Sequence, residues 1–369
     1  MSAPARPKDN ILFTPGPLTT SMTVKEAMLR DLGSRDFEFI EIVREIRGAL
    51  LEIGEVSDDA YTAIPMQGSG TFAIESIFSS TVPSDGKVLI AKNGAYGDRM
   101  ATMCGVMDIE FTVAAFPENS AVEPAVVARH LDDDAAITHV AVVHCETTTG
   151  IMNPVEEIGE VVRSAGRCYF VDAMSSFGAV PLNLGKSNID YLVSSANKCI
   201  EGMPGFGFVI ARRAAIEATE GFARSLSFDL LAQLRGLDSN GQFRFTPPTH
   251  VLLAFRQALR ELSDEGGVAG RARRYKGNYE ILVEGMRRLG FEEYIDPELQ
   301  GYIITSFRYP DREHFEFDEF YSRLNARGWT IYPGKVSDAD CFRIGTIGRL
   351  FPPDIENLLL AIEDIMRSL

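Results

Sequence analysis

One lysine stands out as a candidate for covalent chemistry. Lys198 lies in SSANKCIEGMPGFGFVIAR, between the apolar runs IDYLV and GFGFVI. A lysine in such surroundings is usually paired, reaches the surface with its charged tip, or acts chemically. Partial removal from water disfavours the ammonium form, and the neutral amine is a good nucleophile. Which of these roles applies to Lys198 depends on the residues elsewhere in the chain.

Other polar residues with chemical potential follow strand-like runs. Asp172 ends the run CYFVDA, at the edge where α/β sheets bind ligands, and there it either caps a helix or meets a cation. The turn GSGT, residues 68–71, offers backbone amides, a helix start and two hydroxyls, which suit a phosphate. GSGT is neither a Walker loop nor a GxGxxG turn, and a plain loop before a helix is the alternative. The hydroxyl-rich loop HCETTTG, residues 144–150, also ends a strand-like run.

These features together fit one cofactor. A phosphate site, an aspartate at a strand end and a buried lysine match pyridoxal phosphate, which Lys198 would hold as a Schiff base. Asp172 would keep the pyridine nitrogen protonated, so that the ring takes up electrons. Arg343, in the short run CFRIGT, suits a bidentate grip on a carboxylate. A chance combination in an ordinary α/β domain is the alternative.

The elements that must position these residues alternate between strands and helices from about Tyr61 to Arg213. The strand-like runs are KVLIA, HVAVVHC, CYFVDA, DYLVSS and GFGFVIA. They are apolar on both faces, as in a sheet that helices cover on both sides. TFAIESIFSS, beginning at Gly70 or Thr71, the segment after NGAYGDRM, and PVEEIGEVVRSAG are expected to be helices. This alternation predicts a mainly parallel α/β sheet.

The pattern changes after about Thr249. Two long amphipathic helices, VLLAFRQALRELSDEGG and RRYKGNYEILVEGMRRLGF, are followed by short strand-like runs, GYIITSFRY, TIYPG and CFRIGT, and by the helix DIENLLLAIEDIMRSL. This arrangement predicts an α+β C-terminal domain over residues 266–369. It follows a large domain over 21–265 and an N-terminal arm over 1–20, which we place near the small domain.

The composition narrows the class of protein and partner. The 369 residues carry a net charge of −16, which argues against nucleic acid or an anionic membrane as a partner, because both attract basic surfaces. A few local cations still allow an anionic small-molecule substrate. No apolar run approaches the roughly 20 residues of a membrane span, and the N-terminus lacks an apolar signal segment. We therefore expect a soluble, cytoplasmic protein.

Cysteine and histidine add no further chemistry. Five cysteines, an odd number without a CxxC pair, are scattered through apolar segments, as expected of reduced thiols in the core of a cytosolic protein. The five histidines are too dispersed for metal-ligand spacing. The sequence therefore predicts no metal site.

Over nearly its whole length the chain resembles the class V aminotransferases, which are fold-type I pyridoxal-phosphate enzymes. The segments that carry the resemblance are LFTPGPLTTSMTVKEAM, GSGTFAIES, NGAYGDRM, HCETTTGIMNP, FTPPTH, IYPGK and CFRIGTIG. DAMSSFG together with SSANKC and GMPGF is more specific, and is similar to the branch that acts on 2-aminoethylphosphonate and pyruvate. The resemblance implies a large domain with a seven-stranded, mainly parallel sheet between helices, plus a smaller α+β C-terminal domain.

The resemblance also implies roles for individual residues. Lys198 would form the Schiff base and move the proton between Cα and C4′, and Asp172 would pair with the pyridinium nitrogen. Arg343 would take the carboxylate of pyruvate or alanine. The implied cofactor-binding residues are Lys198, Asp172, Ser69, Gly70, Thr71, Tyr96, Thr148, Asn197 and, from a neighbouring subunit, Thr246.

Three of these assignments keep an alternative. Tyr96 would lie over the pyridine face, but it could instead be core packing. Thr246 would contact the phosphate, but it could be an ordinary turn residue before Pro247. Arg35, in GSRDFEF, could meet the phosphonate of the substrate or be an exposed arginine beside a helix.

The activity implied by the resemblance is a ping-pong transamination. The amine of 2-aminoethylphosphonate would pass to the cofactor and then to pyruvate, giving phosphonoacetaldehyde and L-alanine, in a homodimer with shared active sites. An alanine– or serine–glyoxylate aminotransferase with another donor is the alternative. A pyridoxal-binding protein without catalysis would have lost Lys198, Asp172 or Arg343, and the sequence keeps all three.

Overall fold

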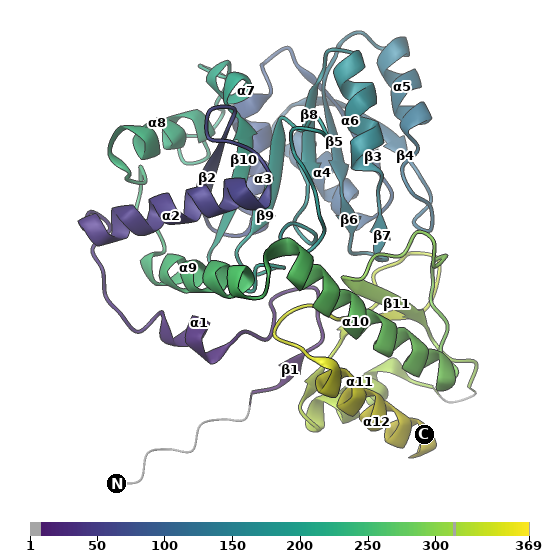
Figure 1. The fold of residues 1–369 in the computed structure, drawn as a ribbon. Coiled ribbons are helices and arrows are strands. Elements are labelled where there is room, and N and C mark those ends of the chain that lie inside the picture. The colour runs from purple at the N-terminus through teal and green to yellow at the C-terminus, as the bar shows by residue number, and fades with distance from the viewer. Residues whose placement is uncertain (1–8, 313–314, 369) are drawn as a thin grey trace.

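The computed structural model describes residues 9–312 and 315–368, and Figure 1 shows their arrangement. The large sheet and its helices form one part of the molecule, and a smaller part holds the C-terminal strands and helices α10, α11 and α12. The first eight residues of the predicted N-terminal arm lie outside the described residues. Within the described residues, no helix is long and apolar enough to cross a membrane.

Seven strands form the large sheet, in the order β2-β10-β9-β8-β5-β3-β4. Their bounds are β2 Tyr61–Gln67, β3 Lys87–Lys92, β4 Glu110–Ala115, β5 Ile137–Val143, β8 Cys168–Asp172, β9 Tyr191–Ser195 and β10 Phe206–Arg212. β4, β3, β5, β8 and β9 pair in parallel, whereas β10 runs antiparallel to β2 and to β9. The mainly parallel sheet predicted from the alternation of strands and helices is confirmed.

One predicted strand ends earlier than expected. HVAVVHC was predicted to be continuous, but β5 ends at Val143, and Cys145–Glu146 form β6 in a hairpin with β7, Ile151–Met152. The chain turns at His144, whose backbone N–H donates to the Asp172 carbonyl and whose own carbonyl accepts from Asn153. These two bonds direct the chain out of the sheet and into the polar loop that follows.

Helices cover the large sheet and complete its core. They are α2 Phe37–Ile53, α3 Gly70–Thr81, α4 Ala95–Val106, α5 Pro124–Asp133, α6 Val155–Ser164, α7 Arg213–Glu217, α8 Leu230–Asn240 and α9 Thr249–Asp264. The helices expected in TFAIESIFSS, after NGAYGDRM and in PVEEIGEVVRSAG are confirmed as α3, α4 and α6. The buried apolar residues of these elements form one continuous cluster with the sheet.

A second apolar cluster lies in the C-terminal part of the chain. It is built by α10 Gly267–Arg288, α11 Phe317–Ala326, α12 Pro352–Ser368 and the sheet β11-β14-β13, with β11 Ile304–Arg308, β14 Cys341–Gly345 and β13 Tyr332–Pro333. Phe13 joins this cluster, because β1, Ile11–Leu12, pairs in parallel with β12, Trp329–Thr330. The segment predicted as one strand, TIYPG, is therefore two strands: β12 pairs with the N-terminal segment and β13 with β14.

The N-terminal segment then runs from the small sheet toward the large one. Gly345 donates its backbone N–H to the Phe13 carbonyl at 3.0 Å, and the chain continues through Pro15 and Gly16 to the short helix α1, Met22–Glu26. Contacts between α1 and α9 fix the far end of the segment. The sequence TPGP is thereby held between the two parts of the molecule.

Candidate active site

The predicted residues gather because several strands end at one edge of the large sheet. The antiparallel register places Gln67, at the end of β2, opposite Phe206, while Ser195, at the end of β9, lies opposite Gly207. The ends of β2 and β9 therefore flank the start of β10 on that edge. Asp172, at the end of β8, pairs in register with Val143 and Val193 of the adjacent strands, so the loops that follow these strands share the same edge.

Lys198 lies in the turn after β9, beneath the TPGP loop. Its Nζ donates to the Pro15 carbonyl at 2.6 Å, and its side chain is partly buried. Burial lowers the pKa of the amine, against the opposing influence of Tyr96 and Asp172. A Cβ at Gly16, whose φ is +119°, would come within 2.9 Å of this Nζ, so only glycine lets the loop approach so closely. The amine is therefore fixed in place and biased toward its nucleophilic form.

Asp172 presents an unpartnered carboxylate oxygen to the same edge. The side chain is 1% exposed, and Oδ1 accepts from the Met174 backbone N–H at 2.9 Å. Oδ2 is buried without a hydrogen-bond partner among the described residues. Burial raises the pKa of this carboxyl to about 7. A buried carboxylate with a vacant oxygen is poised to accept a hydrogen bond from a cation.

The N-terminus of α3 lies at this edge as the sequence predicted. Ser69 is the N-cap residue and its side chain makes no capping hydrogen bond. A Cβ on Gly70 would overlap the side chain of Met174, which follows Asp172 in the chain. Arg99 Nη1 lies 3.5 Å from Thr71 Oγ1. The helix start thus combines free backbone amides, hydroxyls and a cation, which favour an anion.

The loop after β5 contributes a second buried carboxylate. Glu146 is fully buried, its Oε1 accepts from Thr148 Oγ1 at 2.6 Å and from the Thr148 N–H at 3.0 Å, and its Oε2 is unpartnered among the described residues. Burial raises the pKa of Glu146. Thr148 Oγ1 in turn accepts from the Ala95 N–H at 3.0 Å, at the start of α4. Thr148 therefore fixes the loop against the helix that carries Tyr96.

Two cationic side chains lie over the aromatic ring of Tyr96. Lys335 Nζ lies 4.3 Å and Arg99 Cζ 4.9 Å from the centre of its ring. Burial raises the pKa of the phenol, but the charge of Lys198, a hydrogen bond with Thr147 and the charges of Lys335 and Arg343 together leave the pKa below its ordinary value. Cationic side chains from α4 and from the loop after β13 therefore meet at the Tyr96 ring, which also packs against the core of the large sheet.

Arg343 reaches this point from β14 of the small sheet. It is 6% exposed, its Nε donates to the Pro333 carbonyl at 3.0 Å and its Nη1 to the Thr147 carbonyl at 2.7 Å. Burial lowers the pKa of the guanidinium. Tyr96 also lies close enough to interact with the guanidinium, and the N–H groups that remain can still bind a carboxylate end-on.

Two predicted residues lie apart from this group in the single chain. Arg35 and Thr246 are both exposed and line one surface hollow. Gln67 Nε2 donates to the Thr246 carbonyl at 3.3 Å, which places the hollow close to the start of α3. Asn197 stays within the site, where its Oδ1 accepts from Ser195 Oγ at 3.1 Å.

The structure adds four residues that the sequence reasoning did not single out. Glu146, Arg99 and Lys335 lie in the segments HCETTTG, NGAYGDRM and IYPGK, and Pro15 lies in TPGP. Their segments were recognised, but only the fold shows that these particular side chains or carbonyls approach Tyr96 or Lys198. For Glu146, Arg99 and Lys335, the sequence signal that could have identified them is a charged residue in or beside a glycine-containing turn that follows a strand.

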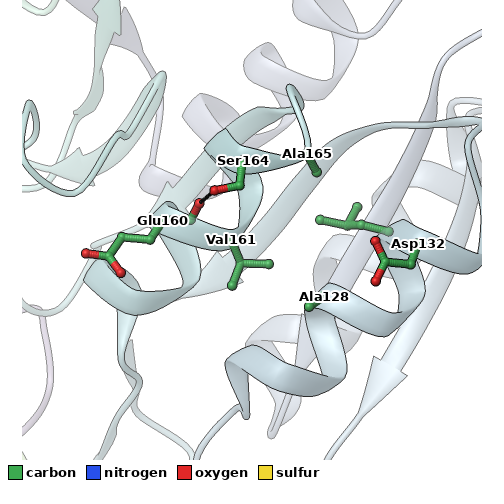
Figure 2. Close-up of a pocket in the computed structure, with 7 residues that line it drawn as sticks. Ala128, Asp132, Glu160, Val161, Ser164 and Ala165 are labelled. Carbon is green, nitrogen blue, oxygen red and sulfur yellow. Dashed lines mark hydrogen bonds between the residues drawn. The ribbon is translucent and has the colours of Figure 1, made fainter.

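Other hollows of the surface carry none of this chemistry. Figure 2 shows one between α5 and α6, lined by Ala128, Asp132, Glu160, Val161, Ser164 and Ala165. Its polar groups are two carboxylates and a hydroxyl that already donates to the Glu160 carbonyl at 2.8 Å. All five cysteines are free thiols, and within residues 9–312 and 315–368 no group of histidine, cysteine and carboxylate side chains could hold a metal ion.

The assembled groups can bind a phosphorylated aromatic aldehyde and a small anionic amine. The α3 N-terminus suits the phosphate, the vacant oxygen of Asp172 suits a protonated ring nitrogen, and the Lys198 amine suits a carbonyl carbon. Arg343 and Lys335 supply positive charge from the opposite side. The set matches the requirements of an amino-group transfer.

Comparisons with known proteins point to the same chemistry. The family described as "Aminotransferase class-V" matches residues 19–334. A 2-aminoethylphosphonate–pyruvate transaminase of Syntrophobacter fumaroxidans is 52% identical over 357 residues, which cover 96% of each chain. The enzyme of the same name from Klebsiella pneumoniae is 50% identical, over 97% of this chain and 98% of its own. The crystal structure of an alanine–glyoxylate aminotransferase from Nostoc sp. superposes with a TM-score of 0.90 at 25% identity, covering 100% of this chain and 98% of its own.

Proposed function

This chain belongs to the class V aminotransferases, and we propose that it transfers the amino group of 2-aminoethylphosphonate to pyruvate, giving phosphonoacetaldehyde and L-alanine. Its fold is that of the fold-type I aminotransferases. The observation that carries the proposal is identity at about half of all positions, over nearly the full chain, to transaminases named for these two substrates. The likeness to an alanine–glyoxylate enzyme is much weaker in sequence and supports the fold more than the donor.

The residues of the site fit pyridoxal phosphate as the cofactor. The buried Asp172 Oδ2 lacks a partner among the described residues, as expected of the oxygen that meets a protonated ring nitrogen. Ser69, Gly70 and Thr71 would hold the phosphate at the start of α3, and Lys198 would hold the carbonyl carbon. When bound, this cofactor supplies an electrophilic carbon for amines and a ring that takes up electrons.

The chain's own residues then move the proton. With the cofactor bound, the amine of Lys198 would be the base that removes the proton from the donor carbon bearing nitrogen. The Pro15 carbonyl, 2.6 Å from Nζ, orients that amine, and burial lowers its pKa, which favours the neutral amine. Nζ would pass that proton to the carbonyl-derived carbon of the cofactor, and in the second half-reaction it would carry a proton in the reverse direction, to the carbon that becomes the Cα of alanine, while Arg343 would bind the carboxylate.

Two copies of the chain would share their active sites. Thr246 and Arg35 are exposed in the single chain and line one hollow near the α3 start, as expected of residues that a second subunit presents or covers. Phe37 and Phe245, next to this hollow in sequence, are 92% and 44% exposed. Sedimentation velocity of the holoenzyme should give a dimer, and Thr246→Ala should weaken retention of the cofactor. A monomer with full activity would refute the shared site.

Turnover with defined donors tests the activity. The purified holoenzyme should convert 2-aminoethylphosphonate and pyruvate to L-alanine, and glyoxylate should not replace pyruvate efficiently. Lys198→Ala should abolish turnover and the near-visible absorbance that arises when the cofactor is linked to a lysine. The control Lys186→Ala changes an exposed lysine far from the site and should alter neither. No alanine from 2-aminoethylphosphonate, with alanine–glyoxylate exchange intact, would assign the sister activity instead.

A further inference from the structure

A phosphonate donor poses a charge problem that a carboxylate donor does not. A phosphonate carries up to two negative charges on three oxygens, whereas a carboxylate carries one charge on two. The whole chain carries a net charge of −16, so local cations must supply the attraction within the site. Two of the donor groups of Arg343 are already engaged by the carbonyls of Pro333 and Thr147. A single, partly engaged guanidinium matches a carboxylate better than a dianion.

Lys335 is the second cation on the same side of the site. Its Nζ lies 4.3 Å from the centre of the Tyr96 ring, and its charge contributes to the lowered pKa of Tyr96, as that of Arg343 does. Lys335 and Arg343 are carried by neighbouring parts of one hairpin: Tyr332 of β13 pairs with Arg343 of β14, and Lys335 follows β13. The two cations therefore approach Tyr96 from the small sheet together.

Lys335 has no anionic partner of its own. Among the described residues, no carboxylate oxygen lies within 4.0 Å of its Nζ, although many other basic side chains of this chain form ion pairs. The charge of Lys335 also acts on the buried Glu146, whose raised pKa favours the neutral form. A lysine held at a buried ring without a counter-ion has its charge available for a ligand.

Arg99 does not serve the same purpose. It also lies over the Tyr96 ring, but its Nη1 is 3.5 Å from Thr71 Oγ1, at the start of α3. Its position therefore suits the phosphate of the cofactor. Lys335, by contrast, comes from the small sheet together with Arg343.

The loop that carries Lys335 is fixed at both sides. Ser337 donates from its backbone N–H and its Oγ to Glu118 Oε2, at 2.8 and 3.0 Å. The Tyr294 hydroxyl donates to Asp338 Oδ1. A Cβ on Gly334 would overlap the backbone of Cys341, so the turn before the lysine is tightly packed against β14. These contacts hold the loop in one position and thereby fix where the Lys335 ammonium lies.

We propose that Lys335 binds the phosphonate of the amino donor and so determines the preference for a phosphonate over a carboxylate at the donor's distal end. The inference rests on the proposed function for the identity of the donor. Arg343 then serves the carboxylate of pyruvate and alanine, and both cations act on the dianion. Lys335→Met should discriminate between the two half-reactions, which removal of a merely structural lysine would not do.

Donor comparison in the holoenzyme tests the assignment. Lys335→Met should lower kcat/KM for 2-aminoethylphosphonate by about 30-fold, the loss of one charge-assisted contact. The values for L-alanine and for 3-aminopropionate, which has the same spacer but ends in a carboxylate, should change by less than about 3-fold. Lys335→Arg should restore most of the loss, and Lys186→Met should have no effect. Equal losses for all donors, or an unchanged value for the phosphonate, would overturn the proposal.

A binding measurement separates this inference from the activity itself. Ethylphosphonate and propionate lack the amine, so calorimetric titration of the holoenzyme with each reports the distal contact without turnover. Ethylphosphonate should bind about 30-fold more weakly to Lys335→Met than to the wild type, with propionate little changed. If the wild type does not use 2-aminoethylphosphonate yet shows this difference, the proposed function fails and the role of Lys335 stands. If ethylphosphonate binds both proteins equally, the role of Lys335 is wrong whatever the donor.

Discussion

Two groups of buried charges lie next to each other in this protein and are arranged in opposite ways. In the first, Lys198 and Asp172 have no oppositely charged partner within 4.0 Å among the described residues. In the second, Glu201 Oε1 accepts from Arg274 Nη2 at 2.7 Å and from the Tyr275 hydroxyl at 2.6 Å. Lys198 and Glu201 belong to the same turn, NKCIE.

The second group connects the lysine turn to the rest of the molecule. Arg271, 0% exposed, lies 3.3 Å from Glu201 Oε1, and its Nε donates to Glu265 Oε2 at 2.8 Å. Arg274 also donates to Glu265 and to the Leu350 carbonyl. The ionic cluster therefore joins the turn after β9 to the α9–α10 junction and to the segment before α12.

The presence or absence of an oppositely charged partner separates the charges that stabilise the fold from those that are available for chemistry. A buried charge without a partner is destabilising, so such groups persist where a ligand completes them. The paired cluster stabilises the turn. The Lys198 amine and the Asp172 carboxyl lie at the sheet edge without charged partners, where cofactor and substrate would bind. A change at Glu201 therefore tests the paired cluster, and a change at Asp172 tests the group without charged partners.

Removal of Glu201 should have the largest effect on stability. Glu201→Ala leaves Arg271 and Arg274 buried without their shared carboxylate oxygen, and should lower the free energy of unfolding by about 3–5 kcal/mol. The midpoint of urea denaturation of the holoenzyme measures this loss.

A surface carboxylate provides the matched control for Glu201. Glu284 forms an exposed ion pair with Arg288 on α10, and Glu284→Ala should change the same free energy by less than about 1 kcal/mol. Similar losses for both variants would show that the buried cluster contributes no more than a surface pair, and the contrast between the two regions would not hold.

The carboxyl of Asp172 should make stability depend on pH in the protein without cofactor. Its pKa is raised to about 7 from an ordinary value of 3.8, so the folded state keeps the proton to higher pH than the unfolded state does. Stability is therefore lost as pH rises between these two values, by at most about 1.4 kcal/mol per pH unit. Asp172→Asn should remove this slope.

Denaturation of the cofactor-free protein from pH 4.5 to 8 measures the effect of Asp172 as a difference between wild type and variant. Because both proteins share the buried histidines, the titration of those histidines cancels. A difference that stays constant over this range, or rises with pH, would contradict a raised pKa for Asp172.

Much of the fold could be read from the sequence because local patterns report it directly. Runs such as KVLIA and DYLVSS are apolar on both faces, and helices follow them with clear starts. The breaks in HVAVVHC and TIYPG could not be read, because they depend on pairing with residues far away in the chain. Trp329–Thr330 is a strand only because Ile11–Leu12 lies beside it.

The candidate site divides in the same way. Lys198, Asp172 and the GSGT turn were identified from residue type and position after apolar runs, because strand ends of a parallel sheet meet at one edge. Glu146, Lys335 and Pro15 gained their roles only from contacts between segments that are far apart in the sequence. No local pattern predicts that a lysine of the small sheet lies against Tyr96.

Residue types and spacing alone identified the reacting groups of a class V aminotransferase: the Lys198 amine, the Asp172 carboxyl and the anion-binding GSGT turn. The tertiary structure decided which of its buried charges are neutralised and which remain vacant. The physical reason is that burial and partnership are properties of the packed molecule. Lys198 and Glu201 lie in one short turn, yet the packing of α10 beside that turn gives Glu201 two arginine partners, whereas the TPGP loop offers Lys198 only a backbone carbonyl.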